Sequence, residues 1–116
     1  MLLNKGPESW ASDPNVHALR VELSTEHTFL LPYDQFVFAE IEQVDGEQLL
    51  RMVFATHEVT VHGHSLRRLV TGLQRRDLAA ISLFSDPRRI AAPDGQPVIR
   101  GIDVTPIQDS DETPTP

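Results

Sequence analysis

Residues 54–84 read FATHEVTVHGHSLRRLVTGLQRRDLAAISLF. Val59 and Val61 alternate with polar residues, which is the period of a half-buried β-strand, and Gly63 allows the chain to bend sharply after them. A helical pattern follows, and Ala80–Phe84 indicates another strand. The stretch therefore predicts a strand, a tight turn, a helix and a second strand, and the rest of the chain can be placed around it.

The helix is predicted over about Ser65–Arg76. Its apolar residues recur at intervals of three and four, so they form one narrow stripe that consists of Leu66, Leu69, Val70 and Leu73. Ser65 is a good N-cap, because its hydroxyl can accept a hydrogen bond from a backbone N–H of the first turn. Asp77 would fall on the apolar side of a longer helix, so we expect the helix to end near Arg76.

A β-hairpin is predicted at Asp45-Gly46, which lies between two apolar runs, because both central residues of a type I′ turn have positive φ. Such a turn sets the register of the two strands. Three apolar pairs then share one face of the sheet: Ile41 with Leu50, Ala39 with Met52, and Val37 with Phe54. Glu40 lies opposite Arg51 on the other face, where the two charges form a favourable pair.

The apolar positions change parity between Phe54 and Val59, which a straight strand cannot do. We therefore expect a second tight turn or a β-bulge within residues 55–58. A turn at Thr56-His57 would place Phe54 opposite Val59, and a longer turn is an equal alternative.

Together with further strand patterns at Val16–Leu23, Thr28–Tyr33 and Val98–Val104, these features predict an α+β fold. Its antiparallel-rich sheet has about five or six strands, with one amphipathic helix packed on one face. We expect the helix stripe to cover six apolar residues: Val37, Ile41, Met52, Phe54, Val59 and Val61. Residues 16–107 form the single predicted domain, residues 1–15 a flexible N-terminal segment, and residues 108–116 a disordered acidic tail.

Composition limits the classes of function. The chain has 116 residues, a net charge of −7 and no cysteine, which excludes disulfides and thiolate chemistry and fits a cytoplasmic protein. No apolar run approaches the length of a membrane span, and the N-terminus lacks the apolar core of a signal peptide, so we expect no membrane partner.

A metal site is one candidate for chemistry. Glu58, His62 and His64 project to the same side of the predicted strand, and imidazoles with a carboxylate suit zinc or another transition metal. A polar sheet face with histidines near turns explains the same residues more simply. We therefore expect no cofactor, and a small metal-dependent enzyme ranks third among the functions considered.

A basic surface is a second candidate. Residues 59–92 carry a charge of +4, and their arginines are Arg67, Arg68, Arg75, Arg76, Arg88 and Arg89. The guanidinium fork suits phosphate and carboxylate groups. Nucleic-acid or phosphate-ligand binding through Arg67, Arg68, Arg75 and Arg76 is therefore the alternative function. The acidic chain and the lack of aromatic neighbours other than Phe84 favour a solvated helix face instead.

Self-association is the function that we expect first. The second face of the sheet carries Phe36, Phe38 and Val53, and one helix cannot cover both faces. These residues must meet the N-terminal segment with Trp10 as a lid, another layer of strands, or a partner, most simply a second copy in a homodimer. No catalytic motif is present, so the sequence predicts a non-enzymatic interaction or assembly module.

Overall fold

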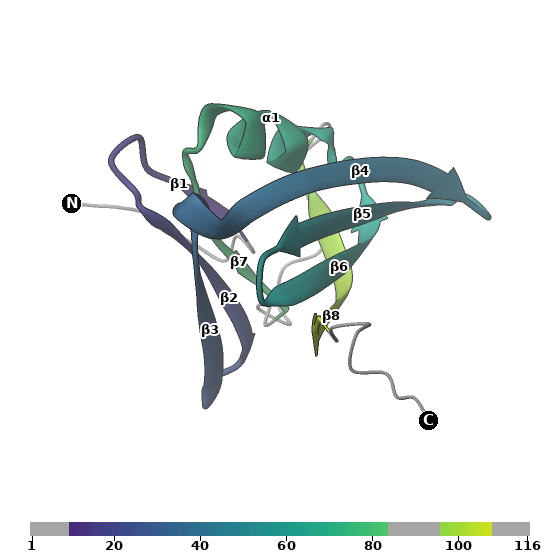
Figure 1. The fold of residues 1–116 in the computed structure, drawn as a ribbon. Helices are drawn as coiled ribbons and strands as arrows, with labels where there is room; N and C mark the ends of the chain where they lie inside the picture. The colour runs from purple at the N-terminus through teal and green to yellow at the C-terminus, as the bar shows by residue number, and fades with distance from the viewer. Residues whose placement is uncertain (1–9, 84–95, 108–116) are drawn as a thin grey trace, which may run out of the picture.

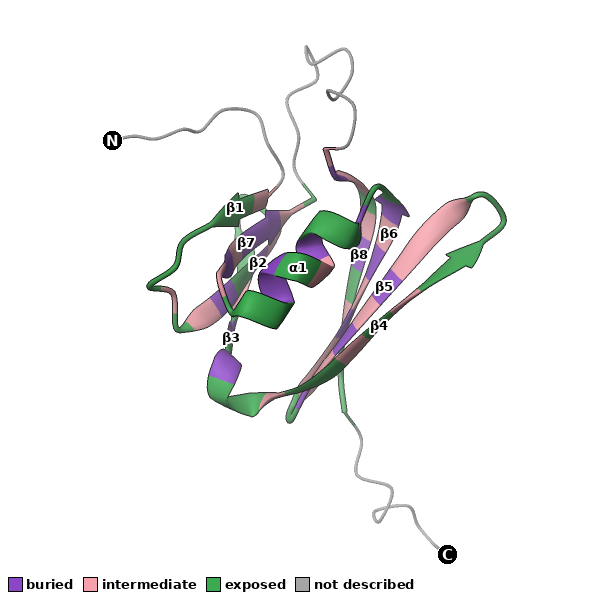
Figure 2. Cartoon of the chain, turned by 90° about the horizontal axis from the view of Figure 1, so that it is seen from above, coloured by how far each residue is buried: buried purple, intermediate pink, exposed green. Residues whose placement is uncertain are grey.

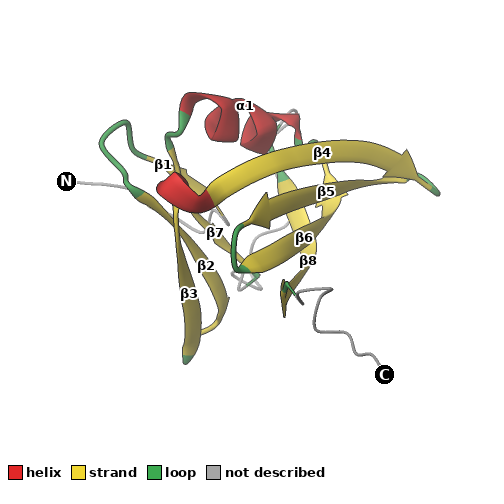
Figure 3. Cartoon of the chain, in the orientation of Figure 1, coloured by secondary structure: helices red, strands yellow, loops and turns green. Residues whose placement is uncertain are grey.

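The computed structural model describes residues 10–83 and 96–107. They form eight strands in two four-stranded sheets, one α-helix and one short 3-10 helix (Figure 1, Figure 3). The predicted α+β class is confirmed in this broad sense, but the strand number was too low and the single sheet was wrong. No helix among these residues is long and apolar enough to cross a membrane.

The first sheet has the strand order β1-β7-β2-β3. Its strands are β1 (Trp10–Ser12), β7 (Leu78–Ser82), β2 (Ala18–Ser24) and β3 (His27–Pro32). β2 and β7 pair in parallel, and the other two pairings are antiparallel. The sheet therefore takes in part of the segment, residues 1–15, that the sequence assigns to a flexible N-terminus.

The second sheet has the order β4-β5-β6-β8 and is antiparallel throughout. Its strands are β4 (Phe36–Val44), β5 (Glu47–Phe54), β6 (His57–His64) and β8 (Val98–Pro106). The 3-10 helix η1 (Tyr33–Gln35) links β3 to β4, and α1 (Arg67–Arg75) links β6 to β7. Both connections cross from one sheet to the other.

One hydrophobic core lies between the two sheets, and the buried side of α1 faces into it (Figure 2). Four of the six residues that we expected in the core around the helix stripe are fully buried, namely Met52, Phe54, Val59 and Val61. Ile41 is half-buried and packs against this core. Val37 is 60% exposed, so the prediction for this residue was wrong.

A β-bulge at Val37 explains that error. The hairpin register is as predicted from Val44 opposite Glu47 through Phe38 opposite Val53. It then shifts, so that Phe36 rather than Val37 lies opposite Phe54. An extra residue on one strand turns the following side chains to the other face. Phe36 therefore contacts the core and Val37 does not.

The turn after Phe54 is also displaced from its predicted position. Met52 lies opposite Val59 and Leu50 opposite Val61, so the two turn residues are Ala55 and Thr56 rather than Thr56 and His57. A two-residue shift of register leaves every side chain on the same face. The hydrophobic pattern alone therefore cannot distinguish the two turns.

The N-terminal end of α1 differs from the prediction, whereas its C-terminal end agrees with it. Ser65 has a positive φ of 57° and is not the N-cap, which is Leu66. The backbone N–H of Leu66 instead donates a 2.6 Å hydrogen bond to the side-chain oxygen of Gln48 on β5. At the other end, Arg76 adopts the left-handed conformation (φ 61°) that commonly closes a helix.

Candidate anion-binding site

Arginines on strands and arginines on the helix have different surroundings. Each of the three strand arginines forms an ion pair with glutamate: Arg20 with Glu22, Arg51 with Glu40 and Glu58, and Arg100 with Glu47. The hydrogen bonds that Arg51 donates to Glu58 and Glu40 raise its pKa above the ordinary value. By contrast, the side chains of Arg67, Arg68, Arg75 and Arg76 are exposed and form no ion pair or hydrogen bond with any residue that the structure describes.

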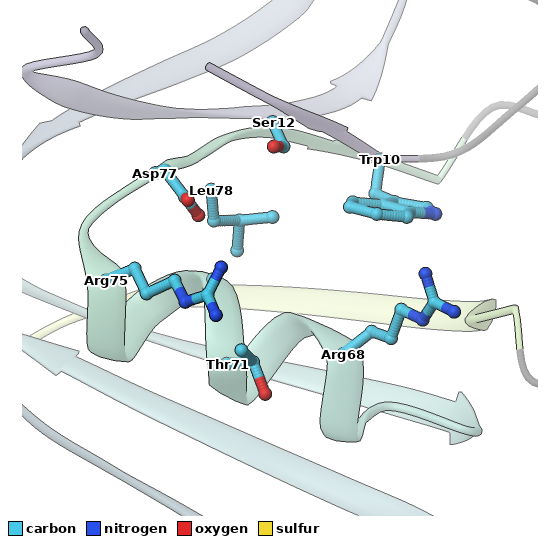
Figure 4. A pocket seen from close by; sticks show the side chains of 8 residues that line it. Trp10, Ser12, Arg68, Thr71, Arg75, Asp77 and Leu78 are labelled. Carbon is cyan, nitrogen blue, oxygen red and sulfur yellow. The ribbon is translucent and has the colours of Figure 1, made fainter. Parts of the chain in front are cut away.

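Two of these four arginines lie at a pocket between α1 and the first sheet, with a volume of about 320 Å³. Its lining consists of Trp10, Ser12, Arg68, Thr71, Gly72, Arg75, Asp77 and Leu78 (Figure 4). Arg68, Thr71 and Arg75 are three and seven residues apart, so they share one face of the helix over about 10 Å of its axis. Arg67 and Arg76 do not line the pocket.

Close packing of the helix on β7 forms the floor of the pocket. A Cβ atom at Gly72 would lie 3.0 Å from the Cβ of Leu78, so a larger residue would push the two elements apart. The backbone N–H of Asp77 donates to the carbonyl of Gly72 (2.9 Å), and that of Asp13 donates to the carbonyl of Asp77 (2.8 Å). The helix end and the loop after β1 are therefore held together.

Charge is distributed unevenly along the pocket. Figure 4 places Asp77 with Arg75 at one end and Arg68 with Trp10 at the other. Asp77 brings a carboxylate to the Arg75 end of the pocket, although the two residues form no ion pair. Among the described lining residues none brings a carboxylate to the Arg68 end, so an anion would be held most favourably there.

Trp10 places an aromatic ring beside Arg68 and Arg75 in this pocket. The sequence did not predict this proximity. β1 pairs with β7, where Trp10 lies opposite Ile81, and the indole is half-buried against the core. The indole N–H has no hydrogen-bond partner in the described part of the chain. No local pattern relates Trp10 to residues about sixty positions away, whereas Thr71 could have been found from the helical spacing of Arg68 and Arg75.

The remaining candidates from the sequence are two arginines and three possible metal ligands. Arg88 and Arg89 lie outside the described residues. Glu58 accepts a 2.6 Å hydrogen bond from Arg51, His62 lies 3.4 Å from Asp103, and His64 is exposed at the end of β6. Residues 10–83 and 96–107 contain no group of three side chains arranged for a metal ion.

Of the three interface candidates, Phe38 and Val53 lie opposite each other on β4 and β5, whereas Phe36 faces the core. Phe36 contacts Phe54 with ring centroids 5.3 Å apart and packs against the core. Val53 is half-buried. Phe38 is 42% exposed and lies beneath the guanidinium of Arg51, 5.4 Å from its carbon. Phe38 is therefore the most exposed of the three candidates.

Comparisons of the chain with protein-family models, with curated proteins and with solved structures find no match.

Proposed function

We propose that the protein is a binding module that holds an anionic group of another molecule on the helix arginines, at the pocket of Arg68 and Arg75. The observation that supports this most directly is the difference between the two sets of arginines. Every described arginine on a strand has a glutamate partner, whereas the four helix arginines have none.

Such a cluster of unpaired charges lowers the stability of the free protein. Four positive charges within ten residues repel one another, and no acidic side chain of the described residues pairs with them. A bound phosphate or carboxylate would relieve this repulsion and accept charge-assisted hydrogen bonds from the guanidinium forks. The pocket volume falls at the lower end of the range for small-molecule sites.

An NMR titration of the full chain with inorganic phosphate tests this proposal. We expect saturable changes of the amide signals of Arg68, Thr71 and Arg75. The variant Arg67→Gln/Arg76→Gln is the matched control, because it removes two helix charges outside the pocket and should leave these changes in place. Absence of any change, or equal changes at the strand arginines, would contradict the proposal.

Self-association is a second candidate function, supported by β4. Three of the exposed large hydrophobic residues lie on this strand: Val37 (60%), Phe38 (42%) and Val44 (44%). β4 is also the terminal strand of its sheet, and its outer edge pairs with no other strand in the described residues. An open edge with apolar side chains is a common site of pairing between chains. The partner would be a second copy of this chain.

A further inference from the structure

The candidate pocket combines three kinds of chemical group in one small cavity. Trp10 offers an aromatic surface, Arg68 a guanidinium, and Asp77 a carboxylate that accepts hydrogen bonds. Figure 4 shows Arg68 extending toward the indole, with Asp77 at the opposite end of the pocket. A ligand that uses all three needs a flat ring system, an anionic group and hydrogen-bond donors.

The order of these groups restricts the ligand further. The anionic group belongs at Arg68, because Asp77 would repel it at the Arg75 end. A ring system can stack on Trp10, since every nucleobase offers a flat π-surface to an aromatic side chain. The carboxylate of Asp77 then faces hydroxyl or amino groups of the same molecule, the contact that acidic residues make with ribose in other nucleotide sites.

From this arrangement we propose that the pocket binds a nucleoside monophosphate, with the phosphate on Arg68, the base on Trp10, and Asp77 accepting hydrogen bonds from the sugar or base. This inference rests on the proposed anion-binding function and names its ligand class. The pocket, at about 320 Å³, has room for one such molecule. A nucleic-acid chain fits less well, because the protein carries a net charge of −7.

The protein contains one tryptophan, so its fluorescence reports on this pocket directly. We would titrate the full chain with adenosine monophosphate, ribose 5-phosphate and a single-stranded oligonucleotide. Adenosine monophosphate should quench the emission of Trp10 with saturation and bind about tenfold more tightly than ribose 5-phosphate, because only the nucleotide can stack.

Single substitutions separate the contributions of Arg68 and Trp10 to binding. Arg68→Gln should weaken adenosine monophosphate binding about tenfold, through loss of charge-assisted hydrogen bonds to phosphate. Arg67→Gln, one residue away and outside the pocket, should retain the affinity of the parent. Trp10→Leu, measured by calorimetry, should bind adenosine monophosphate and ribose 5-phosphate equally, with circular dichroism showing whether its fold is retained. If Trp10→Leu does not fold, the quenching and the Arg68→Gln comparison still decide the matter.

The remaining outcomes distinguish a wrong ligand class from a wrong binding function. Equal affinity for adenosine monophosphate and ribose 5-phosphate without quenching would reject the nucleotide and leave anion binding intact. Much tighter binding of the oligonucleotide, increasing with its length, would replace the nucleotide by a nucleic-acid strand. Lack of binding by all three probes, together with no response to inorganic phosphate, would reject the proposed function itself.

Discussion

The hydroxyl of Tyr33 donates a 2.6 Å hydrogen bond to the backbone carbonyl of Leu78. Tyr33 lies on η1, which joins the two sheets, and Leu78 begins β7, directly below the candidate pocket. Both residues are buried, so water does not compete for this bond. The bond therefore ties the connection between the sheets to the strand on which α1 packs.

Replacing Tyr33 by phenylalanine should lower the free energy of unfolding by about 1–2 kcal/mol, because the buried carbonyl of Leu78 would lose its donor. Urea unfolding followed by circular dichroism measures the change. Asp34→Asn is the control, since this neighbouring side chain is exposed and should have no comparable effect. A Tyr33→Phe protein as stable as its parent would show that the bond contributes nothing.

The same tyrosine predicts a loss of stability in alkali. Burial, and secondarily the charge of Asp77, raise the pKa of Tyr33 to about 12. The unfolded chain releases this proton near pH 10, whereas the folded protein keeps it until about pH 12. Below pH 10 both states are protonated and stability does not change. Between pH 10 and 12 only the unfolded state ionises, so the folded state becomes less stable. The loss should grow with pH across this range and level off above the folded-state pKa.

Absorbance at 295 nm tests the alkaline prediction directly, because the chain has one tyrosine. Its ionisation in the folded protein should have a midpoint near pH 12, and in urea near pH 10. A midpoint near pH 10 in the folded protein would show that the hydroxyl is not shielded from water.

Arginines with a structural contribution and arginines with a binding function should differ in their effect on stability. Arg51→Gln should lower the urea midpoint, because it removes the hydrogen bonds to Glu40 and Glu58. Arg68→Gln and Arg75→Gln should leave the midpoint unchanged or raise it, because each removes an unpaired charge from a repulsive cluster. A decrease as large as that of Arg51→Gln would indicate a structural contribution instead.

Self-association through β4 can be tested by placing one positive charge on the exposed side of this strand. Sedimentation velocity should show a dimer for the parent and a monomer for Val37→Lys, because lysine blocks pairing at an exposed edge. Leu30→Lys is the matched control, since Leu30 is 65% exposed on β3, an edge strand of the other sheet. A monomeric parent, or dissociation by Leu30→Lys rather than Val37→Lys, would reject this surface.

Local chemistry predicted the parts of the fold that depend on near neighbours. Asp45 and Gly46 both have positive φ, and the register that they set is correct as far as Phe38. The spacing of seven residues likewise places Arg68 and Arg75 on one face of the predicted helix. The bulge at Val37 could not be predicted, because Phe36 and Val37 are equally apolar and either could face the core.

Pairings between distant residues explain what the sequence did not reveal. β7 lies between β1 and β2, so the first sheet joins segments that are about sixty to seventy residues apart. The strand patterns give no information on such partners, and therefore the strands were assigned to one sheet. The same pairing brings Trp10 to α1, so the arginines have an aromatic neighbour that is not adjacent in sequence.

Calorimetric titration with inorganic pyrophosphate at low salt tests most directly whether the helix arginines bind an anionic group. Three proteins are compared: the parent, Arg68→Gln/Arg75→Gln, and Arg20→Gln/Arg100→Gln, which loses the same charge on strands. The parent should bind one pyrophosphate, the pocket variant at least about tenfold more weakly, and the strand variant like the parent. No binding by the parent, or equal losses in both variants, would contradict a specific site on α1.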